Sequence, residues 1–162
     1  MNRPNAAHPL SLTLALVALC CNALIGQQAT SPAYAPAVTN GTRWFEGIGG
    51  LRIKMLVEAS NLGGAEVELG EITFPAGSGA TGRGHTHTAV EVFYILSGEL
   101  HHVVNDTTYV LQPGMVGIVR PGDRVIHRVP SDTPVRALVI WAPGGEAERL
   151  ASFFTVRPIE QH

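Results

Sequence analysis

Cysteine is scarce in this sequence and confined to one place. Cys20 and Cys21 are adjacent, close to the N-terminus. If that segment is removed, the remaining chain can form no disulfide and offers no thiolate as a nucleophile or metal ligand. Its stability must then come from apolar burial, together with whatever a bound metal contributes.

Charged and aromatic residues are also few. Charged residues make up 15% of the chain and aromatic residues 6%, and the formal net charge is −2. There is no basic stripe and no platform of interleaved aromatic residues, so no nucleic-acid partner is expected. Apolar residues reach 45%, which suffices for a packed core, and the 18 glycines and 11 prolines favour short elements joined by turns.

No hydrophobic run has the length of a typical membrane span. The run Leu10–Ile25 is shorter than the roughly 20 residues that a span needs, and it follows Arg3. With the small residues after it, this pattern predicts a cleaved signal peptide over residues 1–33. An uncleaved membrane anchor and a lipoprotein signal at Cys20 or Cys21 are the alternatives. We expect a periplasmic or secreted protein with no membrane contact after cleavage, a flexible arm over residues 34–45 and a folded domain over residues 46–162.

The folded domain reads as all-β. Short apolar or alternating segments separated by Gly, Pro, Asn and Asp predict an antiparallel barrel or sandwich. Within it, Val90–Leu96 is predicted to be a strand buried on both faces, with a tight hairpin turn at Ser97-Gly98, and Glu146–Phe154 is predicted to be a short C-terminal helix. The predicted strands are Ile53–Glu58, Glu66–Phe74, Val90–Leu96, Leu100–Val104, Tyr109–Leu111, Met115–Val119, Val125–Val129 and Val135–Trp141.

Three potential metal ligands precede and enter the Val90–Leu96 segment. His85, His87 and Glu91 are all odd-numbered, so on an extended chain they point to the same side. Two imidazoles and a carboxylate aimed into an apolar interior are costly unless a cation neutralises and coordinates them. The alternative is that the histidines are solvated residues of a glycine-rich loop.

The spacing of these residues resembles the first sequence motif of the cupin superfamily. Gly79 is followed by five residues and His85, one residue and His87, three residues and Glu91, and six residues and Gly98. Gly114, Pro121, Gly122 and His127 resemble the second motif, with one extra residue between the proline and the histidine. The resemblance covers residues 66–143 and is to small single-domain bacterial cupins, similar to the quercetin dioxygenase-like type.

This resemblance implies a small antiparallel β-barrel, or double-stranded β-helix of the jelly-roll type, with a metal near one mouth. It implies that His85, His87, Glu91 and His127 bind one divalent transition metal, which would be Fe, Mn or Ni, with Zn, Co or Cu also possible. If the irregular spacing turns His127 away, a two-His-one-carboxylate triad remains.

For function, the resemblance favours a metal-dependent dioxygenase that acts on a small enolic or phenolic substrate, with Glu91 as the catalytic proton acceptor. A non-catalytic protein that binds a sugar or carboxylate, and a metal-dependent isomerase or decarboxylase, remain alternatives. An additional inward-facing titratable group beside the metal would favour the isomerase or decarboxylase.

Further histidines and arginines are expected near the site, and one apolar segment is expected at an interface. Of the neighbours His101 and His102, one should face inward. Among Arg83, Arg120, Arg124 and Arg128, at least one should lie near the pocket mouth. Because Val90–Leu96 has more apolar residues than a small barrel interior needs, a homodimer is expected.

Overall fold

The alternation of side chains along the chain produces most of the strands in the computed structural model, which describes residues 39–160. In β3 (Glu68–Phe74) every second residue is buried, and β9 (Val135–Ala142) shows the same pattern. This is the period expected of a strand with one face on a core. The signal peptide predicted over residues 1–33 lies outside the described residues.

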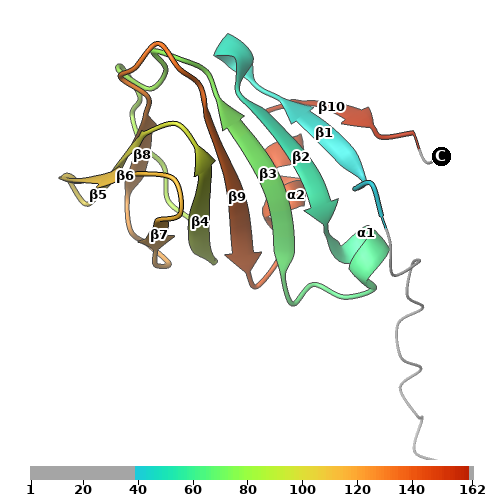
Figure 1. The fold of residues 1–162 in the computed structure, drawn as a ribbon. Helices are drawn as coiled ribbons and strands as arrows, with labels where there is room; N and C mark the ends of the chain where they lie inside the picture. Colours follow the sequence, from blue (N-terminus) through green and yellow to red (C-terminus); the bar gives the residue numbers. More distant parts are fainter. Residues whose placement is uncertain (1–38, 161–162) are drawn as a thin grey trace, which may run out of the picture. The chain divides into compact units, whose positions relative to one another are not determined.

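The strands form two antiparallel sheets, so the all-β prediction is confirmed (Figure 1). The larger sheet has the order β10-β1-β2-β3-β9-β4-β7, and the smaller has the order β6-β5-β8. Besides β3 and β9, the larger sheet contains β1 (Arg43–Glu46), β2 (Arg52–Val57), β4 (Val90–Ser97), β7 (Val116–Val119) and β10 (Thr155–Pro158). The smaller contains β5 (Leu100–Val104), β6 (Thr107–Leu111) and β8 (Val125–Arg128).

One hydrophobic core serves both sheets. Leu100 and Leu111 of the smaller sheet belong to the same buried cluster as Phe45, Phe93 and Val139 of the larger sheet. Burying apolar area on the inner faces of two sheets is the main stabilisation available to an all-β chain. The two sheets therefore enclose the interior into which the candidate ligands point.

The predicted hairpin at Ser97-Gly98 is wrong. β4 pairs with β7 and β9, whereas β5 pairs with β6 and β8, so the chain passes from one sheet to the other at this point. Gly98 makes this passage with a φ of 80°, and an added Cβ would lie 2.6 Å from the carbonyl oxygen of Pro134. A sheet-to-sheet corner needs the same turn residues as a hairpin, and sequence alone does not separate the two.

The turn at Asn105-Asp106 does connect a hairpin. Val104 of β5 lies opposite Thr107 of β6, which leaves two residues in the loop. Both have positive φ, 46° for Asn105 and 65° for Asp106. This is the type I′ geometry that suits the twist of paired strands and that asparagine and aspartate tolerate.

The segment Val90–Leu96 is buried on one face only, in contrast to the prediction. Glu91, Phe93 and Ile95 point inward, while Tyr94 and Leu96 are exposed. The second sheet and the core cover the inner face, and within the described chain no element covers the outer face. The apolar outer residues are thus a surface feature and not a part of the core.

At the N-terminal side the sheet begins earlier than expected. β1 starts at Arg43, inside the segment assigned to a flexible arm, and it pairs with β2 on one edge and β10 on the other. Phe45 of β1 is fully buried. Two short helical segments follow β1 and β2, η1 (Ile48–Gly50) and α1 (Ala59–Leu62).

The C-terminal helix is present but shorter than predicted. α2 spans Glu146–Ala151, and the chain then turns and forms β10, which pairs with β1. Phe154, expected in the helix, packs edge-to-face on Phe45 with ring centroids 6.3 Å apart. The helix ends early because the residues after it form β10, which pairs with the distant strand β1. The local sequence does not reveal this pairing. No helix among residues 39–160 is long and apolar enough to cross a membrane.

Candidate metal centre

Three of the predicted ligands meet at one point. One ligand atom each of His85, His87 and Glu91 lies within 4.8 Å of the others. Glu91 is on the inner face of β4, whereas both histidines belong to the loop that precedes β4. Backbone bonds fix that loop: His85 and Val125 exchange hydrogen bonds of 3.0 and 2.8 Å, and the Gly122 N–H donates to the His87 carbonyl at 3.0 Å. The extended backbone predicted here is thus held by β8 and its preceding turn.

Gly79 explains how the ligand loop can lie so close to β8. Its φ is +81°, and an added Cβ would lie 2.0 Å from the carbonyl oxygen of His127. Only a residue without a side chain allows this approach. The glycine therefore brings the loop that carries His85 against the strand that carries His127.

His127 lies beside the three-residue group without belonging to it. Its ring centroid is 5.9 Å from that of His85 and 4.6 Å from that of Phe93. The Nε2 atom is buried and has no hydrogen-bond partner in the described part of the chain. Burial lowers the pKa of His127 to about 3, so the ring is neutral, which is the form that binds metals.

The residues present suit a divalent metal. Glu91 Oε2 and His127 Nε2 are buried and lack a hydrogen-bond partner among residues 39–160, and the nearest carboxylate oxygen to His87 Nε2 is Glu91 Oε1 at 3.3 Å. A buried polar group left unpaired costs about 1–3 kcal/mol, and more if it is charged. A cation bound here would remove these costs, and imidazole with carboxylate is a donor set typical of transition metals.

Glu91 is held by a contact that sequence reasoning missed. Trp141 of β9 lies opposite Glu91 and its indole N–H donates to Oε1 at 2.8 Å. Burial by itself would raise the pKa of Glu91, but His87 and this hydrogen bond lower it below its ordinary value. The carboxylate is therefore ionised, with Oε1 occupied and Oε2 available. Trp141 also belongs to the buried hydrophobic core.

His87 is contacted on both ring nitrogens. Its Nε2 lies 3.3 Å from Glu91 Oε1, and its Nδ1 lies 3.3 Å from Glu146 Oε2 of α2. Burial lowers the pKa of His87, but the two carboxylates outweigh burial and raise it to about 9. A carboxylate on the second nitrogen of a ligating histidine fixes the tautomer and the ring orientation. Nothing in the spacing of the motif pointed to Glu146.

Arg149 completes this group from the same helix. Its Nε donates to Glu146 Oε2, and its Nη2 lies 3.3 Å from His87 Nδ1. A cation near the pocket mouth was expected from Arg83, Arg120, Arg124 or Arg128. Arg83 lines an outer pocket, but Arg149 is the cation next to the ligand group.

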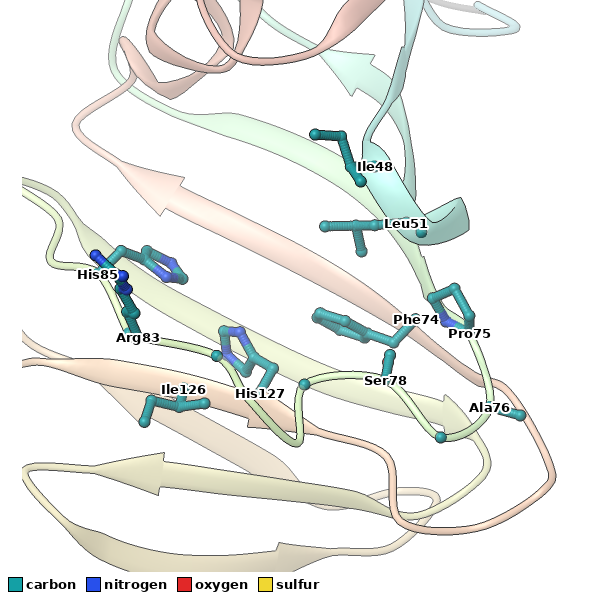
Figure 2. Close-up of a pocket in the computed structure, with 15 residues that line it drawn as sticks. Ile48, Leu51, Phe74, Pro75, Ala76, Ser78, Arg83, His85, Ile126 and His127 are labelled. Atoms are coloured by element: carbon teal, nitrogen blue, oxygen red, sulfur yellow. The ribbon is translucent and has the colours of Figure 1, made fainter.

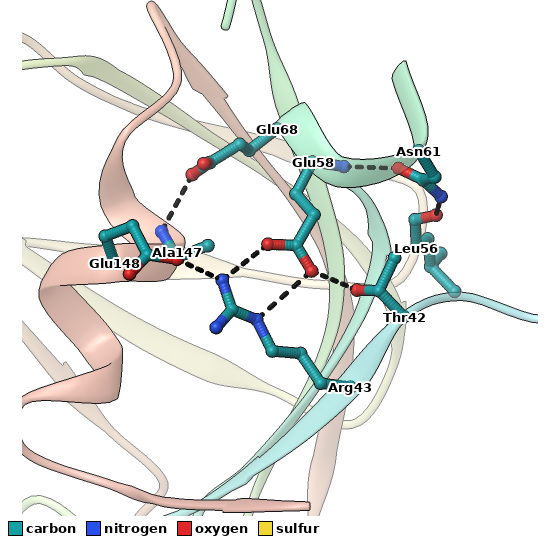
Figure 3. Close-up of polar contacts among 8 residues, drawn as sticks. All are labelled: Thr42, Arg43, Leu56, Glu58, Asn61, Glu68, Ala147 and Glu148. Carbon is teal, nitrogen blue, oxygen red and sulfur yellow. Dashed lines mark hydrogen bonds and ion pairs between the residues drawn. The ribbon is translucent and has the colours of Figure 1, made fainter. Parts of the chain in front are cut away.

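One hydrogen bond and one ion pair connect α2 to the large sheet (Figure 3). Glu68 of β3 accepts the Ala147 N–H at 2.9 Å, and Arg43 of β1 lies 2.6 Å from Glu148. Arg43 is also paired with Glu58. The helix is thereby tied to two strands, which sets where Glu146 and Arg149 point.

Two cavities meet at the ligands. An inner cavity of about 340 Å³ is bordered by His85, His87, Glu91 and His127, by Arg149 and by apolar side chains. The apolar lining consists of Leu51, Ile53, Ile72, Phe74, Phe93, Trp141, Leu150, Phe153 and Phe154. An outer pocket of about 640 Å³ lies between Ile48 and Leu51 on one side and His85, Ile126 and His127 on the other (Figure 2).

His102 is the inward-facing member of its pair and lies next to His127. Its ring stacks on that of His127 at a centroid distance of 5.2 Å, and both ring nitrogens are buried without a hydrogen-bond partner in the described chain. Burial lowers its pKa. His101 is half-buried, and its Nε2 lies 3.1 Å from Glu99. His102 does not border either cavity, so it supports His127 and offers no surface to a ligand.

The comparisons with known proteins agree with this architecture. Residues 70–141 match the family model described as Cupin domain. The chain is similar to the structure of an RmlC-like cupin from Shewanella frigidimarina, with 25% identity and a TM-score of 0.56 over 74% of this chain and 99% of that chain.

Two further solved structures share the fold. KdgF from a Halomonas species has 13% identity and a TM-score of 0.55, over 65% of this chain and 89% of that chain. A Cupin 2 conserved barrel domain protein from Salinispora arenicola has 18% identity and a TM-score of 0.52, over 67% and 88%. No curated protein matches the chain.

Proposed function

We propose that this protein is an exported metal-dependent enzyme, a dioxygenase acting on a small enolic or phenolic substrate. Its folded part is a cupin domain, and the chain therefore belongs to the cupin superfamily. The observation that carries the proposal is a group of unpaired imidazole and carboxylate atoms at the border of an apolar cavity. The similarity to quercetin dioxygenase-like cupins in the ligand motif supports the choice of reaction.

The chain's own residues have separable roles in this proposal. His85, His87 and Glu91, with His127 beside them, would hold a divalent metal, which supplies Lewis-acid and redox chemistry when bound. Trp141 holds Oε1 of Glu91 by a hydrogen bond, and the contact with His87 is the main cause that lowers the pKa of Glu91 and keeps it ionised. Glu91 is also the residue that can accept the proton that an enol or phenol releases on binding. The apolar cavity wall excludes water from the reacting groups.

The cavity lining favours a dioxygenase or a binding protein over an isomerase or decarboxylase. The latter reactions usually need a second acid or base next to the metal. Besides the ligands, the inner cavity is lined by apolar residues and Arg149, which keeps its charge and transfers no proton. Glu146 is buried behind His87 and does not border the cavity. Non-catalytic capture of a small ligand remains the second candidate.

Metal analysis of the protein expressed with its leader, followed by oxygen-consumption assays with enolic and phenolic compounds, tests the proposal. The expected result is about one metal per chain and oxygen uptake that requires it. His85→Ala and His87→Ala should each remove most of the metal, whereas His101→Ala, which alters a half-buried histidine away from the group, should not. Metal binding without any oxygen uptake would favour the binding protein.

His127→Ala decides the fourth ligand. If His127 binds the metal, the variant should lose affinity as His85→Ala does. If metal content and affinity are unchanged, the site is a two-His-one-carboxylate triad and His127 only lines the cavity.

The proposal also places the mature protein in the periplasm or medium. N-terminal sequencing of exported material should find a start after residues 26–35 and hence no cysteine in the mature chain. A mature protein that still begins at Met1 would contradict export by a cleaved signal.

A further inference from the structure

Arg149 is the single lysine or arginine among the residues that border the inner cavity. It approaches the ligand group from α2, and 37% of its side chain is exposed, so the guanidinium is shielded on one side and open on the other. On its shielded side the guanidinium borders a cavity that is mostly apolar apart from the candidate metal ligands, and there its interaction with an anion is stronger than in bulk water.

The contacts of Arg149 leave donors free. Its Nε donates to Glu146, and its Nη2 lies next to His87 Nδ1. When His87 binds a metal through Nε2, Nδ1 carries a proton that Glu146 accepts, so Nδ1 cannot also accept a bond from Nη2. No carboxylate among the described residues is paired with Nη1 or Nη2. The planar end of the guanidinium, which suits a bidentate partner, therefore has no acceptor of its own.

Charge balance points the same way. With a divalent metal bound and all histidines neutral, the metal and Arg149 carry three positive charges, whereas Glu91 and Glu146, the partner of Arg149, carry two negative ones. The group then has a net charge of +1 at the cavity wall. One anionic group on a ligand would neutralise it.

We propose that the site takes a small, largely apolar ligand that carries a carboxylate, and that Arg149 is the residue that binds this carboxylate. The charge balance in this picture rests on the proposed function, whereas the place of Arg149 at the cavity wall and its contact with Glu146 do not. The cavity of about 340 Å³ is at the small end of ligand pockets, so it suits a single-ring or short-chain acid.

The test uses phenylacetate and its neutral isostere phenylacetamide as probes. Their dissociation constants are measured by NMR titration, following the Arg149 Nε–H and the α2 amides, in both the zinc-loaded and the metal-free protein. Arg149→Gln removes the charge and Arg149→Lys keeps the charge without the fork. Arg157→Gln is the matched control, because Arg157 is an exposed arginine of β10 paired with Glu46.

Wild-type protein should bind phenylacetate more tightly than phenylacetamide. Arg149→Gln should weaken phenylacetate binding about tenfold or more, as expected for loss of a charge-assisted hydrogen-bond pair, with phenylacetamide binding unchanged. Arg149→Lys should fall between the two, and Arg157→Gln should match wild type.

Equal binding of the two probes to the wild type, no saturable binding of phenylacetate, or Arg149→Gln within twofold of wild type would each overturn the proposal. Zinc content is read separately. A protein that takes up no zinc contradicts the proposed function, while the metal-free titrations still decide the role of Arg149.

Discussion

Glu146 and Glu148 are two residues apart on α2 and have separate partners. Glu146 is buried and contacts His87 Nδ1, whereas Glu148 is exposed and pairs with Arg43. Glu146→Ala should lower metal affinity by about 10–100-fold, because the partner that orients the histidine is lost. Glu71→Ala is the control, because Glu71 pairs with Arg136 on the outer face of the large sheet, and it should bind metal as the wild type does. Competition with a chelator measures both, and equal affinities would show that Glu146 does not orient the ligand.

The protonation of His87 makes metal binding depend on pH. In the metal-free protein its pKa is raised to about 9, so at pH 7 the metal must displace a proton. Affinity should therefore rise by up to about tenfold per pH unit between pH 7 and 9 and level off above. His85 and His127, with lowered pKa values, are neutral in this range and add no slope. An affinity that is flat from pH 7 to 9 would contradict this assignment.

The same shift predicts how the metal-free protein responds to pH. Because the folded-state pKa of His87 lies above the unfolded value of about 6.5, its protonated form stabilises the fold below that value. This contribution should be lost as the pH rises through 9, and His87→Ala should remove that part of the pH dependence. Denaturant unfolding of both proteins at pH 6, 7.5 and 9 measures it.

At the scale of elements, the loop between β3 and β4 depends on Gly79. Gly77 and Gly79 both have positive φ, but an alanine Cβ meets nothing within 4 Å at Gly77 and the His127 carbonyl at Gly79. Gly77→Ala should cost about 1–2 kcal/mol of unfolding free energy for the left-handed backbone alone. Gly79→Ala should cost clearly more and also reduce metal affinity, since His85 and His127 would be pushed apart. Similar losses in the two variants would show that the close approach has no role.

The whole molecule exposes an apolar outer surface at one end of the large sheet. Tyr94 of β4 is flanked by Val116 and Leu138, and the next row contains Ile118 and Ile140. Ile118 is 54% exposed on the edge strand β7. A contiguous apolar surface of this kind usually marks a protein interface, and a second copy of the chain is the occupant we predict.

Sedimentation is measured at a protein concentration of roughly tens of micromolar, which is in the range of typical homodimer affinities. The wild type should be a dimer and Ile118→Glu a monomer. Val156→Glu changes an exposed valine on β10, at the opposite edge of the same sheet, and should stay dimeric. A monomeric wild type would count against the homodimer, and a monomer only for Val156→Glu would place the interface at the other edge.

Local patterns in the sequence determined the strands, the class of fold and the three clustered ligands, because side-chain alternation and turn residues act over a few positions. They also identified Glu91, Phe93 and Ile95 as one inward-facing row. What the structure alone decided involves residues far apart in the chain. It separated β4 and β5 into different sheets, ended α2 early so that Phe154 could pack on Phe45, and exposed the outer face of β4. It also placed Glu146, Arg149 and Trp141 around the ligands, because tertiary packing, which no local spacing records, brings α2 and β9 to the end of β4.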